Sequence, residues 1–182
     1  ALIIWFDAYA DINQPSNTPS GYLGGLVLTG AAGVWETGLP QDLNLDNVLL
    51  VGTRNVDPDE QAMIDAGYLR WVRPGPNLMS ELEAAIGQRP VYVHVDCEVL
   101  EPGIVPTEHR DAGGLTLREL HQAAAVLARN EVLGLEIAEF EVSWPDSSNE
   151  EDPMPLIDAL HPLLSKIQPH WLRRKVFDVA LE

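Results

Sequence analysis

The sequence contains very little cysteine, few basic residues and no long apolar run. One residue of 182, Cys97, is a cysteine, which excludes an internal disulfide framework and suggests a reducing, cytoplasmic compartment. Eleven Lys and Arg stand against 28 Asp and Glu, a formal net charge of −17 that disfavours nucleic-acid binding. No stretch reaches the about 18 apolar residues that span a bilayer, because glycines interrupt the longest candidate, residues 21–35. Nucleic-acid and membrane partners are therefore not expected.

What the chain does contain is typical of a single folded α/β domain. Its residues are 46% hydrophobic and 21% charged, and its length suits one domain. Short apolar segments alternate with amphipathic ones, which predicts a mainly parallel sheet covered on both faces. We expect strands at 2–6, 47–52, 68–72, 91–96 and 132–138, and helices beginning near 57, 79, 116 and 153.

The two ends of the chain differ from this pattern. Residues 1–6 already form a strand-like run with no initiating Met, so we expect the natural protein to have further N-terminal sequence. An exposed apolar sheet edge would then need a second chain, or the other piece of a longer parent, to cover it. We predict one domain over 1–167, and a C-terminal tail or docking segment over 168–182, where basic and aromatic residues mix.

Carboxylates follow the ends of three predicted strands. Asp7 and Asp11 lie past the first strand, Asp96 ends the fourth with Glu98 on the same side if the chain stays extended, and Glu139 follows the fifth. Because ligands of open α/β sheets bind beyond the carboxyl ends of the strands, we expect these groups to share one rim. Such a cluster needs a cation, a guanidinium group or protonation to relieve its repulsion. A hard divalent metal such as Mn²⁺ or Mg²⁺ prefers oxygen ligands of this kind.

Four segments, in order, resemble motifs of the arginase/agmatinase (ureohydrolase) family. WFDAYADIN at 5–13, followed by PSG at 19–21, is similar to the first metal motif, Asp-Ala-His-x-Asp with its Ser-Gly loop. HVDCEVLEP at 94–102 resembles the second, Asp-x-Asp-x-x-Asp-Pro. GGLT at 113–116 and GLEIAE at 134–139 match a glycine motif and the last strand of the family. The order and spacing hold from residue 1 to about 167.

The resemblance implies a three-layer αβα fold and, in active members, two bridged Mn²⁺ ions that activate a hydroxide to attack a guanidinium carbon and release urea. Carried over by position, it implies that Glu139 pairs with a guanidinium group and that Asn13 and Ser20 receive the amino-acid end of a substrate. It assigns no catalytic side chain, because Gly24 stands where arginases carry a histidine. The implied metal ligands are Asp7, Asp11, Asp96 and Glu98.

The sequence departs from the family motifs at positions that the resemblance implies for metal binding and proton transfer. Tyr9 replaces a metal-binding histidine, and a phenol with a pKa of about 10 is a poor ligand at neutral pH. Glu98 is one methylene longer than the usual Asp, and Gly24 cannot shuttle a proton. A further ligand histidine of the family lies upstream of the first strand. Four carboxylates and no histidine are left among the implied ligands, so we expect one or two Mn²⁺ ions to bind weakly or not at all.

Two other histidines lie near the implied site in the sequence. His94, two residues before Asp96, shares its face of the strand but lies deeper, and we expect a core histidine bonded to a neighbour. His109 lies in the loop between Asp96 and the glycine motif and is placed to reach the site. Cys97 points away from its acidic neighbours and is expected to be a packed core thiol.

Three hypotheses for the function remain open. The first is a Mn²⁺-dependent hydrolase of guanidino C–N bonds whose missing ligands come from elsewhere. The second is a catalytically inactive arginase-like subunit that serves assembly or regulation, in a homo-oligomer or with a second chain. A phosphoryl-handling α/β domain is disfavoured, because Asp7 and Asp11 are four residues apart and no glycine-rich phosphate loop follows a strand. Tyr9 and Gly24 separate the first two, since an enzyme that lacked only its upstream part would keep both histidines.

Overall fold

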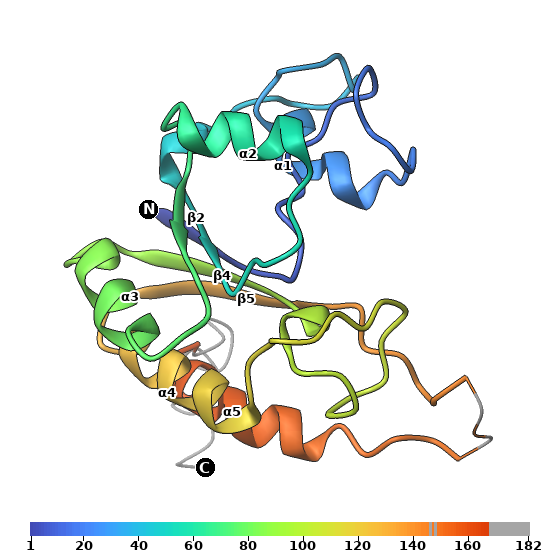
Figure 1. The fold of residues 1–182 in the computed structure, drawn as a ribbon. Helices are drawn as coiled ribbons and strands as arrows, with labels where there is room; N and C mark the ends of the chain where they lie inside the picture. The colour runs from blue at the N-terminus through green and yellow to red at the C-terminus, as the bar shows by residue number, and fades with distance from the viewer. Residues whose placement is uncertain (146, 148, 168–182) are drawn as a thin grey trace, which may run out of the picture.

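A five-stranded parallel sheet forms the centre of the protein (Figure 1). The structure is a computed structural model that describes residues 1–145, 147 and 149–167, so the predicted C-terminal segment, 168–182, lies outside it. The strand order is β3-β2-β1-β4-β5, and every pairing is parallel. The strands are β1 (Leu2–Phe6), β2 (Val48–Val51), β3 (Arg70–Val72), β4 (Val91–Asp96) and β5 (Val132–Ala138).

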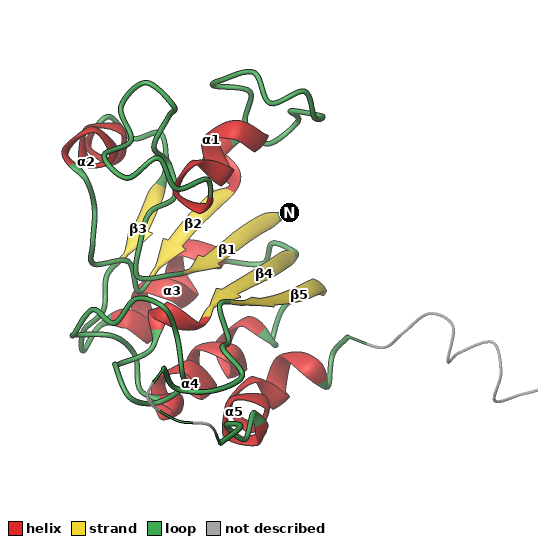
Figure 2. Ribbon diagram, turned by 90° about the vertical axis from the view of Figure 1, so that its right-hand side faces the viewer, coloured by secondary structure: helices red, strands yellow, loops and turns green. Residues whose placement is uncertain are grey.

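Helices cover both faces of the sheet, which makes a three-layer αβα fold as predicted (Figure 2). One group of helices lies on one face of the sheet and a second group on the other (Figures 1 and 2). The first group is α3 (Leu78–Ile86), α4 (Leu117–Leu127) and α5 (Met154–Leu164); the second is α1 (Val27–Ala31) and α2 (Pro58–Asp65). Within the part of the chain that the structure describes, none of the helices has the length and apolar character to cross a membrane.

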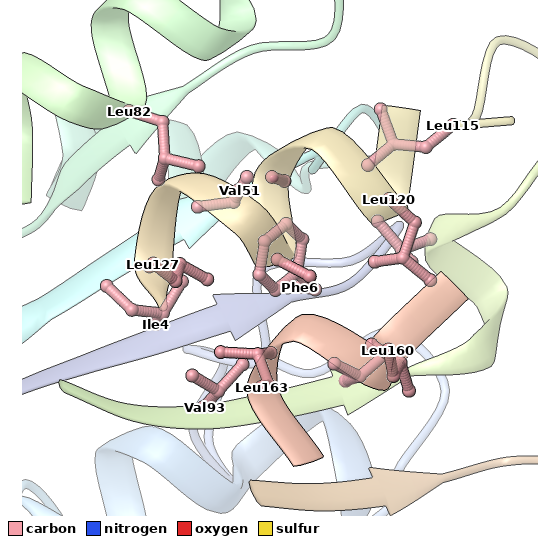
Figure 3. Packing of buried hydrophobic residues seen from close by; sticks show 14 of the residues in the cluster. Ile4, Phe6, Val51, Leu82, Val93, Leu115, Leu120, Leu127, Leu160 and Leu163 are labelled. Atoms are coloured by element: carbon pink, nitrogen blue, oxygen red, sulfur yellow. The ribbon is translucent and has the colours of Figure 1, made fainter. Parts of the chain in front are cut away.

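Alternation along each strand builds two separate apolar cores. Ile4 and Phe6 of β1 face α4 and α5, where they belong to one buried cluster with Leu120 and Leu160 (Figure 3). Trp5, between them in sequence, points to the opposite face and joins the smaller cluster on the side of α1 and α2. Because side chains alternate along a strand, Trp5 lies on the same side of the sheet as Asp7, two positions further along.

The helix starts follow from local hydrogen bonds. Thr116 Oγ1 accepts a hydrogen bond from the Glu119 amide, and the Glu119 carboxylate accepts one from the Thr116 amide, which is the capping box that the sequence predicts. Asp57 and Glu60 form the same arrangement before α2. Helix α1, by contrast, was not predicted, because glycines interrupt the apolar pattern of its segment. It begins directly after a 3-10 turn at Gly24–Leu26.

The two outer strands are protected to different extents. β3 is only three residues long and packs against α3. β5 is seven residues long, every one of its residues is at least partly exposed, and Leu133 is 52% exposed. β5 therefore offers a longer and more open edge than β3 does.

Candidate metal and substrate site

A pocket of about 460 Å³ lies beyond the carboxyl ends of β1, β4 and β5. It collects the residues that the sequence analysis singled out, although they come from positions far apart in the chain. Its lining includes Asp7, Asp11, Asn13, Ser20, Gly24, Asp96, Glu98 and Glu139. Their convergence at the ends of parallel strands is the geometry of ligand sites in open α/β sheets. The part that each residue plays stays a prediction.

A tight turn after β1 brings two carboxylates to the pocket. Asp7 Oδ1 accepts a hydrogen bond from the Tyr9 amide at 2.9 Å. Asp11 adopts φ of 56°, a left-handed conformation that Asp tolerates better than most residues, and its Oδ2 accepts a hydrogen bond from Trp5 Nε1 at 3.2 Å. The indole of Trp5 thus reaches from the strand to the end of the turn and fixes the Asp11 carboxylate beside Asp7.

The chain after β4 does not stay extended, although Glu98 still lies beside Asp96. A 3-10 turn spans Cys97–Val99, and Asp96 Oδ1 accepts a hydrogen bond from the Glu98 amide at 2.8 Å. The guanidinium group of Arg54 donates to the carbonyl oxygens of Glu98 and Asp111, among others, and thereby ties this segment to the loop that follows it. Cys97 is 1% exposed and belongs to the core, as expected.

Hydrogen bonds and steric limits explain why glycines occupy positions 113 and 114, after this turn. Glu101 Oε2 accepts hydrogen bonds from the amides of Gly113 and Gly114 at 2.7 and 2.8 Å. A Cβ atom at Gly114 would lie 2.4 Å from the carbonyl oxygen of Leu100, so only glycine allows this approach. Glu101 therefore holds the loop that closes one side of the pocket and does not line the pocket itself.

Crowding of the carboxylates shifts their protonation. Burial raises the pKa of Asp7 well above its usual value, and the neighbouring Asp11 charge raises it further. Burial raises the pKa of Asp11 to about 7, with a contribution from Asp96. Burial and Asp7 raise the pKa of Asp96 to about 8. The raised pKa values mean that protons relieve the repulsion among these carboxyl groups. A divalent cation could take the place of these protons, and oxygen donors of this kind fit a hard metal ion such as Mn²⁺.

His94 is buried in the floor of the same cluster. It is 6% exposed and stacks on Trp5, with ring centroids 3.6 Å apart and an angle of 11° between the planes. Its Nδ1 lies 3.4 Å from Glu136 Oε2, and burial lowers its pKa, which favours the neutral imidazole. One ligand atom each from Asp7, His94 and Asp96 lie within 4.8 Å of one another. His94 is thus buried in the core as the sequence suggested, but the expected bond to a neighbour is not formed at Nδ1, and the ring lies against the carboxylates.

Aromatic and imidazole groups form the rim of the pocket. His109 Nδ1 lies 3.0 Å from Glu98 Oε1, and the His109 side chain is about half exposed. The Tyr9 hydroxyl donates to Asp111 Oδ2 at 2.5 Å. Burial and the bond to Asp111 raise the pKa of Tyr9, so its hydroxyl stays protonated and engaged. Tyr9 therefore does not offer a free phenolate to a metal.

Glu139 faces the pocket from the end of β5 and has a partner that the sequence analysis missed. Its φ is 56°, which is unusual for Glu, and its Oε1 accepts a hydrogen bond from the Tyr22 hydroxyl at 3.3 Å. A Cβ atom at Gly24 would lie 2.4 Å from the Tyr22 ring. Gly24 thus leaves the space that Tyr22 occupies. In the sequence, the only signal for this contact was the aromatic Tyr22 two positions before Gly24. The partner, Glu139, lies 117 positions away and could not be identified from it.

Asp57 and Glu60, at the start of α2, also line the pocket and were not singled out for the site. Asp57 Oδ2 accepts a hydrogen bond from Asn13 Nδ2 at 2.7 Å, and Glu60 Oε1 accepts one from the Ile12 amide at 3.1 Å. The acidic helix start was visible in the sequence, but its contact with the loop was not. Asn13 Oδ1 remains buried without a hydrogen bond from the described residues.

Comparisons with known proteins point to one family. The sequence profile of the arginase family matches residues 1–150. An N(omega)-hydroxy-L-arginine amidinohydrolase of Streptomyces lavendulae is 30% identical over 162 residues, which cover 89% of this chain and 59% of that protein. The arginase structure of Bacillus caldovelox is 26% identical with a TM-score of 0.74, over 90% of this chain and 59% of that one.

A third similarity concerns the fold alone. The arginase of Entamoeba histolytica, solved in complex with L-ornithine, superposes with a TM-score of 0.78 at 22% identity, over 90% of this chain and 59% of that one. The chain thus spans about three fifths of the length of each of these three proteins.

Proposed function

The chain belongs to the arginase family, and from that premise we propose that it forms the metal- and substrate-binding part of a Mn²⁺-dependent, urea-releasing hydrolase of guanidino C–N bonds. One observation carries this proposal. Five carboxylates from three strand ends line a single pocket of about 460 Å³, and burial together with mutual repulsion raises the pKa of at least three of them. A cluster of this kind is costly to keep empty of cations.

Asp7, Asp11, Asp96 and Glu98 would hold the metal. They supply only oxygen donors, which suit Mn²⁺. When bound, Mn²⁺ supplies Lewis acidity and makes water a competent nucleophile near neutral pH. The chain's own part is to fix these oxygens: Trp5 orients Asp11, the Tyr9 amide orients Asp7, and the Glu98 amide orients Asp96.

The opposite wall of the pocket suits a guanidino compound. Glu139 offers a carboxylate to a guanidinium group, an interaction that is charge-assisted and can be bidentate. Asn13 Oδ1, buried without a partner, is an acceptor for the ammonium group of an amino-acid substrate, and Ser20 lines the same side. The Streptomyces lavendulae relative is named for a guanidino amino acid, which supports this substrate class.

A second candidate function is a non-catalytic arginase-like subunit. It is favoured by the two positions where the family carries histidines. The hydroxyl of Tyr9 is bound to Asp111, and Gly24 yields its space to the ring of Tyr22. Neither position offers a nitrogen to a metal or to a substrate.

We propose that a second polypeptide, either another copy of this chain or a separate segment, covers the β5 edge. The support is the exposure of β5 along its whole length, including Leu133. Unpaired strand edges of this kind invite association. Light scattering with intact-mass analysis tests this idea, and a stable 20.0 kDa monomer would contradict it.

Urea release by the purified full chain, with and without added Mn²⁺, tests the main proposal. Arginine, agmatine and other guanidino acids serve as substrates. We expect Mn²⁺-dependent urea release that falls at least tenfold in kcat/KM for Glu139→Gln, because a charge-assisted contact contributes about 1.5–3 kcal/mol. Glu108→Gln is the matched control, since Glu108 lines the same pocket without an assigned role. Mn²⁺ binding without urea from any substrate would favour the non-catalytic subunit, and absence of Mn²⁺ binding would overturn the main proposal.

A further inference from the structure

We infer that His94 supplies the imidazole ligand of the metal site, in place of the histidine that Tyr9 replaces. This inference rests on the proposed function, since it concerns the same metal. It differs from the ligand set implied by the family motifs, which contains no residue at position 94. The nitrogen ligand would come from within strand β4 and not from the turn after β1.

The position of His94 in the sheet makes this possible. Trp5 and His94 are register partners on β1 and β4, and Asp7 and Asp96 each follow two positions later. Because side chains two apart share one face, all four lie on the same side of the sheet. His94 is therefore the residue directly below the two carboxylates, and its ligand atom and theirs fall within 4.8 Å of one another.

His94 is buried and lacks a satisfied hydrogen bond. It is 6% exposed, and its Nδ1 has no hydrogen bond of good geometry among the described residues. This unpaired atom lies on the side of Glu136, so the case for a metal at Nε2 rests on the grouping of His94 with Asp7 and Asp96. The nearest ionic group is Glu136 Oε2, 3.4 Å from Nδ1.

The surroundings of His94 match those of a metal-bound histidine. Such histidines commonly present their second ring nitrogen to a carboxylate, which sets the tautomer and the ring orientation. Glu136, the register partner of His94 on β5, stands on the Nδ1 side and leaves Nε2 for the metal. Trp5 fixes the ring plane by stacking and at the same time holds Asp11 through its indole N–H. Trp5 and Glu136 are thus positioning residues for His94.

His109, the histidine that lines the pocket, is the natural control. His109 lines the pocket and contacts Glu98, but its side chain is about half exposed and it lies on a loop. The atoms of His109 do not join a group of three donors within 4.8 Å among the described residues. If His94 is the nitrogen ligand, substitution of His94 removes the nitrogen from the metal and substitution of His109 does not; if His109 is the ligand, the reverse holds.

Electron spin echo modulation of Mn²⁺ bound to the full chain tests the inference without reference to activity. We expect ¹⁴N coupling in the wild type, a change of its frequency when the protein carries ¹⁵N-histidine, loss of the coupling in His94→Phe, and retention in His109→Gln. Phe keeps the stack on Trp5, and circular dichroism verifies that the variant folds. Calorimetry should show at least a tenfold loss of Mn²⁺ affinity for His94→Phe, and a smaller loss with retained coupling for Glu136→Gln.

The outcomes separate the inference from the proposed function. Mn²⁺ that binds the wild type without nitrogen coupling would overturn the inference and leave the oxygen-ligand site standing. The same holds for a coupling that survives in His94→Phe or disappears in His109→Gln. If Mn²⁺ does not bind the wild type at all, both the inference and the proposed function fail. The wild-type spectrum shows whether a histidine binds the metal, and His109→Gln shows whether that histidine is His109, so a His94→Phe variant that fails to fold does not protect the inference.

Discussion

The floor and the rim of the pocket are built in different ways. The floor consists of Asp7 and Asp96, and His94 lies against them without lining the pocket. All three are between 2% and 8% exposed, and the register of β1 against β4 fixes their spacing. The rim consists of Tyr22, His109 and Glu139, which lie on loops or just past a strand. One hydrogen bond joins Tyr22 to Glu139, and His109 contacts Glu98 through its amide and its ring. A site that must hold a small ion needs the first kind of support, whereas a site that accepts a substrate tolerates the second.

The largest expected effect comes from removing a floor carboxylate. Asp96→Asn should lower Mn²⁺ affinity at least about 100-fold, because the ion loses a charged ligand at the centre of the cluster. Above pH 8, where Asp96 is ionised, the same change should raise the melting temperature of the metal-free protein by about 2–4 °C, or about 1 kcal/mol, because it relieves repulsion with Asp7. Calorimetry with Mn²⁺ and thermal unfolding in a chelator measure the two effects.

Glu108→Gln is the control for Asp96→Asn, since it removes one negative charge from the rim of the same pocket. It should change neither quantity by more than a small fraction. Equal effects from the two substitutions would mean that overall charge, and not the floor geometry, governs metal binding.

The next effect is the pH dependence of the metal-free protein. Burial raises the pKa of Asp11 to about 7 and that of Asp96 to about 8, while unfolded carboxyl groups titrate near pH 4. Between these values the folded state binds more protons than the unfolded state, so the free energy of unfolding falls as pH rises from about 4 to about 8. Each carboxyl group that stays protonated in the folded state contributes about 1.4 kcal/mol per pH unit, so we expect a loss of several kcal/mol between pH 5 and pH 8, measured by urea denaturation.

Added Mn²⁺ should remove most of this loss, because the ion takes the place of the bound protons. Sodium chloride at the same ionic strength controls for screening, because Na⁺ is monovalent and supplies no competing divalent ion. A metal-free protein that gains stability over this pH range would show that the floor carboxylates are not forced together as the structure has them.

Substitutions at Tyr9 test whether an added imidazole strengthens metal binding. Tyr9→His restores an imidazole next to Asp7, and we expect Mn²⁺ affinity to rise about tenfold, which is about 1.4 kcal/mol. Tyr9→Phe removes the hydroxyl from Asp111 without adding a ligand, so it should leave the affinity unchanged. A fall in affinity for Tyr9→His would mean that the hydrogen bond between Tyr9 and Asp111 is needed to shape the site.

The sequence predicted those parts of the site that depend on strand ends. Asp7 and Asp96 follow apolar runs that are typical of buried parallel strands, so the sequence placed both at the carboxyl edge of the sheet without knowledge of strand order. The placement of Glu98 was inferred from an extended chain that the structure does not have, since a 3-10 turn spans Cys97–Val99. Glu98 reaches the pocket because its amide folds back onto Asp96.

Contacts that depend on which strands are neighbours could not be predicted. The stack of His94 on Trp5 requires β1 to pair with β4 in one register, and the approach of Glu136 requires β5 to pair on the other side. The sequence placed His94 on the correct face but gave no information on its partners. In the same way, Asp57 was recognisable as a helix cap, whereas its hydrogen bond with Asn13 depends on how the loop before α1 folds.

The smallest expected effect concerns the rim. Tyr22→Phe removes a neutral donor from an exposed contact with Glu139, and we expect about a threefold weaker affinity for a guanidino ligand with Mn²⁺ binding unchanged. Gly24→Ala should have a similar effect, because its Cβ would lie 2.4 Å from the Tyr22 ring and displace it. If both substitutions act through the same contact, Gly24→Ala should have almost no effect in a Tyr22→Ala background. If the effects of Gly24→Ala and Tyr22→Ala on ligand affinity are fully additive, Gly24 shapes the rim independently of Tyr22.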